Sequence, residues 1–222
     1  MRRRDVALRF VQLNLGLFGV GLAIALFIRS QLGLGPWDAF HYGLHLQTGL
    51  SVGAASIVTG LVIVFTNLVL GVRPGVGTLL NMVLIGVFMD LLLAVVPDAA
   101  SLPVAAAYFA SAILLFGLAS GAYMAAGFGH GPRDGMMMAL TLRTRRSVRS
   151  IRTMIELSAL LLGWLMGGPI GIGTVLVTTT IGHSVHWGLR VFGALPGRST
   201  RGTATRSEAT RSWWRLRMRR AA

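Results

Sequence analysis

The sequence predicts an all-α membrane protein with six transmembrane helices, arranged as two inverted three-helix repeats. One observation is composition: 54% of the 222 residues are apolar, 13% are charged, and the mean hydropathy is +0.68. The apolar residues fall in blocks of about 16 to 23, close to the length a helix needs to cross a bilayer. The other is a duplication: GLGPWD (33–38) recurs as GHGPRD (129–134), and GVGT (75–78) recurs as GIGT (171–174), both shifted by 96 residues. Such a repeat sets the architecture.

The chain begins with a basic N-terminus at residues 1–9, which carries four arginines. An apolar run at 10–28 follows and superficially resembles a signal peptide. The run is too long for a signal-peptide core, and its A-x-A match at 23–25 lies inside it. We therefore expect a first span that is retained as an anchor.

Repeat 1 covers residues 10–98. Pro36 suits the first turn of a helix, where its missing N–H costs nothing, and Asp38 lies near the exposed amides of that turn. A short helix, too short to span, should begin there. The second span is expected at 52–71 with Ser51 as its cap, and the third at 76–96.

Repeat 2 covers residues 103–194 and repeats this plan. The fourth span is expected at 104–126, and the short helix at 135–142. A basic linker, two further spans and a tail follow; these are predicted at 143–152, 153–168, 172–194 and 195–222. The tail carries eight arginines and two tryptophans without a packed-core pattern, so we expect it to be disordered.

The arginines predict the orientation. Every basic residue is arginine, and the arginines gather in the N-terminus, the linker and the tail. The positive-inside rule places these segments, and both termini, in the cytoplasm. Three spans are an odd number, so the second repeat enters the membrane from the opposite side and the repeats are inverted.

The motifs predict a solute pathway. Inverted repeats with interrupted helices are the common plan of secondary transporters, whose site lies near the midplane. The helix N-termini after the motifs would suit an anion or a carbonyl, whereas the aspartates would suit a proton or a cation, and the sequence does not choose. The structural alternative is that the motifs only turn the chain and start a helix, with the aspartates capping it or pairing with arginine. The pathway candidates are Gly35, Asp38, Gly131, Asp134, Gly77, Thr78, Gly173 and Thr174.

Asp90 lies within the third span, and its repeat equivalent is His186. Ionisable groups inside spans usually face a partner or water, so Asp90, His186 and the nearby His183 are candidates for proton-sensitive roles. The alternative is that Asp90 merely reaches water and that the histidines bond to neighbouring carbonyls.

A metal site is a further alternative. Asp38, His41 and His45 share one helical face with a spacing that metal ligands use. The second copy has Met137 and Thr141 where the histidines would be, so such a site would belong to one half only. We expect no metal and no cofactor.

The partners expected are the lipid bilayer, an unidentified small solute, and anionic lipid at the arginine-rich tail, whose tryptophans suit a membrane surface. Specific nucleic-acid binding is not expected. A homo-oligomer is compatible with the sequence.

The doubled motifs also carry a family resemblance. GLGPWD, PGVGT (74–78), and Gly86 with Asp90 resemble the YczE/YyaS/YitT family of bacterial integral membrane proteins, most of all its YczE branch, over about residues 8–193. The resemblance implies a multi-pass inner-membrane protein, with some members tied to secondary-metabolite production, and it supplies no catalytic residues. The second copy departs from the first at His130 and Arg133.

The expected function is a transporter or permease for a small polar or anionic solute, with a central site at the repeat interface. The alternative is an accessory membrane protein that docks a cytoplasmic partner through the linker and tail. An enzyme is not expected, because the chain has no cysteine and no evident pair of nucleophile and base.

Overall fold

The computed structural model describes residues 3–129 and 131–193. This part is entirely α-helical, as predicted, and its eight helices are α1 (Arg3–Ser30), α2 (Pro36–Thr48), α3 (Val52–Val69), α4 (Val76–Val95), α5 (Leu102–Ala125), α6 (Pro132–Thr144), α7 (Val148–Leu165) and α8 (Ile172–Val191). The bounds of α2, α3 and α4 recur in α6, α7 and α8 with the 96-residue shift that relates the motifs. The duplication is therefore present in the secondary structure. His130 and the tail at 195–222 lie outside the described residues.

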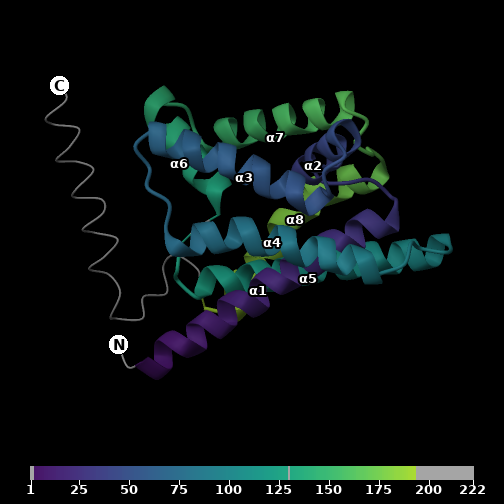
Figure 1. Cartoon of the computed structure of the whole chain (residues 1–222), viewed down its shortest axis with the longest axis horizontal. Helices are drawn as coiled ribbons and strands as arrows, with labels where there is room; N and C mark the ends of the chain where they lie inside the picture. Colours follow the sequence, from purple (N-terminus) through teal and green to yellow (C-terminus); the bar gives the residue numbers. More distant parts are fainter. Residues whose placement is uncertain (1–2, 130, 194–222) are drawn as a thin grey trace, which may run out of the picture.

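The helices form two layers (Figure 1). One layer holds α1, α4, α5 and α8, in which α1 contacts α4 and α5, and α5 contacts α8. The other layer holds α2, α3, α6 and α7, in which α2 and α6 each contact both α3 and α7. The contact between α3 and α4 joins the layers. The two motif helices, α2 and α6, therefore lie in the same layer.

The buried core follows the inner face of α1. Leu17 and Ala23 are fully buried there, and Phe27 packs edge-on against Phe109 of α5 with ring centroids 5.1 Å apart. A Cβ on Gly16 would lie 2.7 Å from the backbone nitrogen of Tyr123, so only glycine permits this approach of α1 to α5. Small residues of this kind let membrane helices approach each other closely.

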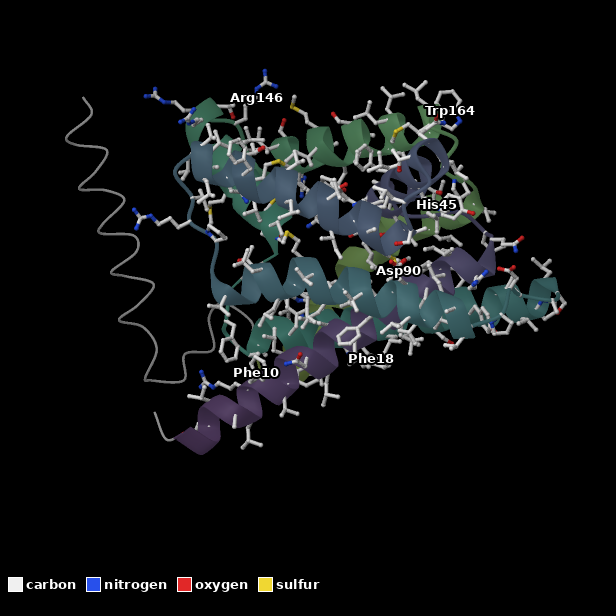
Figure 2. The ribbon with its side chains drawn as sticks, viewed as in Figure 1. Phe10, Phe18, His45, Asp90, Arg146 and Trp164 are labelled. Carbon is white, nitrogen blue, oxygen red and sulfur yellow. The ribbon has the colours of Figure 1, made fainter. Side chains whose placement is uncertain are left out.

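Within residues 3–129 and 131–193, four helices are long and apolar enough to cross a membrane: α1 from Asp5, α3, α4 and α5. Large apolar side chains such as Phe10 and Phe18 lie on their outer surfaces, as Figure 2 shows for α1. The expected fifth and sixth spans also form helices, α7 and α8, but charged and hydroxyl side chains interrupt their apolar surface, including Arg152, Glu156 and Thr178. The count of six spans stays a prediction.

Local signals place most helix ends. Pro36 is the first residue of α2, and the Ser51 hydroxyl accepts a hydrogen bond from the Ala54 amide at 3.1 Å, which confirms both predictions. The linker expected at 143–152 is largely wrong, because α6 continues to Thr144 and α7 begins at Val148. Ser147 caps α7 through the Ser150 amide, and arginine is a good helix former, so the basic segment is mostly helical.

Candidate functional site

The two motif helices begin at one internal cavity of about 890 Å³ between the layers. Gly35 and Gly131 are the residues preceding α2 and α6, and both line the cavity. Asp38 and Asp134, each in the first turn of its helix, line it as well. The four central residues predicted for the pathway are thus brought together from segments 96 residues apart.

Arg133 joins the two motifs. Its guanidinium lies over the Trp37 ring, 4.4 Å from the ring centroid, so a residue of the second motif stacks on a residue of the first. The charges of Asp38 and Asp134 both act on this guanidinium, yet neither carboxylate is within ion-pair distance of it in the described part of the chain. A cation on an aromatic face contributes about 0.5 to 2 kcal/mol, more when water is excluded.

The structural alternative for the aspartates requires them to cap their helices or to pair with arginine. Among the residues described, neither Asp38 nor Asp134 makes a side-chain hydrogen bond or an ion pair. Both carboxylates are partly exposed to the cavity and available to something within it.

His41 lies one turn after Asp38 and also lines the cavity. Its side chain is 1% exposed, and its buried Nε2 atom has no hydrogen-bond partner among the described residues. A buried polar atom without a partner costs about 1 to 3 kcal/mol. His41 is therefore a polar group in the cavity wall whose hydrogen-bonding capacity is unused.

Similarity to known proteins identifies the family of this chain. A family model described as "Family of unknown function (DUF6198)" matches residues 7–190, which is most of the chain. The chain belongs to the DUF6198 family. No solved structure matches this DUF6198 protein.

Three relatives of this DUF6198 protein are membrane or uncharacterised proteins of bacteria. "Uncharacterized membrane protein YczE" of Bacillus subtilis is 40% identical over 189 residues, 84% of this chain and 88% of the relative. An uncharacterised protein of Haemophilus influenzae is 33% identical over 80% of this chain and 81% of its own length. "Uncharacterized protein YyaS" of B. subtilis is 28% identical, over 81% and 91% respectively. The resemblance to YczE and YyaS is confirmed, and the chain is a membrane protein of that family.

The GxGT residues of this DUF6198 protein form a joint between the repeats. The Gly173 amide donates to the Leu32 carbonyl at 2.8 Å, and the equivalent Gly77 amide donates to the Phe128 carbonyl at 3.1 Å. Thr78 and Thr174 accept from the amides of the glycines three residues before them, at 3.3 and 3.2 Å. Within the described residues, the cavity wall does not include these four pathway candidates, and the structure gives them a packing and capping role.

Asp90 also has structural partners. Its carboxylate accepts a hydrogen bond from the Gly53 amide at 2.7 Å and another from the Ser51 hydroxyl, at the N-terminus of α3 (Figure 2). Its counterpart His186 lies in the cavity wall on α8 instead, and so does His183. The three proton-sensitive candidates are therefore divided between a helix junction and the cavity, and their protonation stays a prediction.

The metal alternative finds no support in the residues described. No group of three histidine, aspartate or glutamate side chains with metal-binding spacing occurs there. The Nδ1 atom of His45 lies 2.5 Å from the Leu50 carbonyl oxygen. His41 and His45 share a helix face in the sequence, but the His45 ring contacts the backbone of the turn after α2.

Several residues of the site were missed in the sequence. Trp37 and Arg133 stand at the same position of the two motif copies, and Tyr123 also lines the cavity. Arg133 carried one usable signal, since it is the arginine inside a motif whereas most arginines lie in the termini and the linker.

Proposed function

We propose that this chain is a transporter or permease for a small polar or anionic solute, which binds in the cavity between the repeats. Asp38, Arg133 and Asp134 converge there. The observation that carries the proposal is that the two carboxylates have no hydrogen-bond or ion-pair partner in the described part of the chain, beside a guanidinium held on Trp37. Arg133 supplies the group for an anionic moiety, and the aspartates supply acceptors for N–H or O–H groups. The proposal includes no chemical reaction.

The proposed architecture is six spans in two inverted repeats. It is supported by the reciprocal contacts: α2 with α7 mirrors α3 with α6, and the Gly173–Leu32 hydrogen bond mirrors Gly77–Phe128. A two-fold relation between the halves produces such pairs, and with three spans per half that relation lies in the membrane plane. Placement in the bacterial inner membrane with both termini cytoplasmic, and contact of the tail with anionic lipid, belong to the same proposal.

The experiment is ligand-dependent thermal stabilisation of the purified protein in detergent. Small anions, amino acids and organic cations are screened at two pH values. A ligand at 100 times its Kd stabilises the folded state by about 2.7 kcal/mol. For a chain of this size, that corresponds to a rise in Tm of roughly 5 to 11 °C.

The test variant is Asp38→Asn/Asp134→Asn, and the control is Asp5→Asn, which removes a carboxylate on the exposed start of α1. The proposal predicts that a class of polar compounds raises the Tm of the native protein and the control but not of the double variant. If no compound does so and all three proteins melt alike, the motifs are structural. The alternative function, an accessory membrane protein that docks a cytoplasmic partner, would then replace the transporter proposal.

A further inference from the structure

The interface between α3 and α4 is closed by small residues. A Cβ on Gly53 would overlap the Gly86 carbonyl and the Asp90 carboxylate, and a Cβ on Gly60 would overlap the Met82 side chain. The Gly53 amide is also bound to Asp90 at 2.7 Å. At these contacts the described residues leave no space for another side chain, although Gly60 and Met82 also border the cavity.

The repeat-related helices α7 and α8 have different residues at the same positions. Arg149, Glu156 and His186 stand where the first repeat has Gly53, Gly60 and Asp90. Each replacement removes a close contact or a capping hydrogen bond. In the part of the chain that the structure describes, α7 and α8 make no contact comparable to that between α3 and α4.

Gly182 shows the difference most directly. It is the counterpart of Gly86, but among the described residues no atom beyond its chain neighbours and its own helix backbone lies within 4 Å of the place where its Cβ would be, whereas a Cβ on Gly86 would lie 2.6 Å from the Cγ1 atom of Ile57. The cavity extends into this space. Its wall here, called the α7–α8 cleft below, is formed by Arg152, Glu156, Thr178, Thr179, His183 and His186.

We propose that the α7–α8 cleft is the route by which the solute reaches the central cavity, and that the α3–α4 interface is closed to it. This inference rests on the proposed transport function and assigns its access route. The cleft carries one guanidinium and one carboxylate, Arg152 and Glu156, which pair at 2.8 Å with the arginine still half exposed. Charged groups at membrane depth require water, so the cleft is hydrated and admits polar or zwitterionic solutes, not lipid-like ones.

The chain contains no cysteine, so single-cysteine variants can be made in the native sequence. Leu189→Cys, in the cavity wall on α8, is compared with its repeat counterpart Leu93→Cys, and Val185→Cys in the same wall with Met89→Cys; neither Leu93 nor Met89 lines the cavity. A charged, membrane-impermeant maleimide is the probe, applied to sealed vesicles of both orientations. Two pairs are used so that one variant that fails to fold does not decide the result.

We expect Leu189→Cys and Val185→Cys to label from one side at least tenfold faster than their counterparts. All four should label equally after unfolding in detergent and heat, which controls for the presence of the thiol. Equal rates within both pairs before unfolding, or no labelling of the cleft variants from either side, would overturn the inference.

A blocking experiment tests the same route in the cavity itself. Met137→Cys places a thiol in the cavity wall on α6, and Gly182→Trp adds an indole to the cleft at a position where a Cβ meets none of the described residues outside its own helix backbone. The control is Leu176→Trp, on a part of α8 that does not line the cavity. We expect the tryptophan at 182 to slow labelling at 137 at least fivefold and the control to leave it unchanged; an unchanged rate in both contradicts the route.

The labelling rates require no solute, so this inference and the transport proposal can fail separately. Ligand stabilisation without labelling of the cleft would retain the central site and reject the route. Labelling of the cleft without any ligand would retain the route and reject the proposed transport.

Discussion

Replacing Asp90 by alanine should destabilise the protein much more than the same change at His186, its repeat counterpart. The Asp90 carboxylate accepts hydrogen bonds from Ser51 and Gly53 and so closes the N-terminus of α3. His186 is exposed on the cleft and makes no such bond among the residues described. The two substitutions therefore separate the capping role from the position in the repeat.

The expected magnitude follows from the bonds lost. A hydrogen bond to a charged group contributes about 1.5 to 3 kcal/mol, and the two bonds to Asp90 are not fully additive, so Asp90→Ala should cost roughly 2 to 4 kcal/mol. At about 2 to 4 °C per kcal/mol for a chain of this size, its Tm should fall by roughly 4 to 16 °C. An exposed residue such as His186 should change stability by no more than about 0.5 kcal/mol.

The assay is thermal unfolding of each purified variant in the same detergent, followed by intrinsic tryptophan fluorescence. Asp90→Asn is added because its amide oxygen still accepts from the Gly53 amide, and it should fall between the native protein and Asp90→Ala. Equal Tm values for Asp90→Ala and His186→Ala would refute the capping role. The remaining interpretations of Asp90 would then be a proton-sensitive role or simple contact with water.

Two further predictions concern the repeat joint and the loop between α4 and α5. Gly173→Ala should destabilise the folded protein by about 1 to 3 kcal/mol, because its Cβ would lie 2.6 Å from Phe109. Gly182→Ala has free space for its Cβ and should be neutral or stabilising by up to about 1 kcal/mol. Both effects are measured as changes in Tm. The Arg29 guanidinium, 2.9 Å from Asp98, holds the pKa of that carboxyl below its ordinary value of 3.8. The contribution of this pair to stability is therefore present above about pH 4 and lost as the pH falls below it. Asp98→Asn should then make the decline of Tm between pH 5 and pH 3 less steep. An unchanged decline would contradict the lowered pKa of Asp98.

The fold was predictable where a signal is local or repeated. Pro36 and Ser51 mark helix starts by their own backbone and side-chain chemistry, and the 96-residue shift fixes the second half once the first is assigned. The gathering of Asp38 and Asp134 at one cavity was predictable from the inverted-repeat plan alone.

The specific side-chain and backbone contacts between segments distant in the sequence could not be predicted. The same Gly-x-Gly pattern serves a helix start and a close backbone approach, so Gly77 and Gly173 were expected on the pathway although they form the repeat joint. The stacking of Arg133 on Trp37 depends on the relative placement of the two repeats, which no single sequence contains. The difference between the α3–α4 interface and the α7–α8 cleft likewise appears only when the two helix pairs are compared in space.

Passage across the membrane requires a second opening, and the duplication identifies where it would form. The α3–α4 interface is the counterpart of the cleft, and separating it would break the bonds from Asp90 to Ser51 and Gly53. Asp90 would thus hold that interface closed while solute enters between α7 and α8. Asp90→Ala should then raise maleimide labelling of Met89→Cys at least fivefold below the Tm and leave labelling of Val185→Cys unchanged. If labelling at 89 does not respond, α3 and α4 do not separate there, and Asp90 serves helix stability alone.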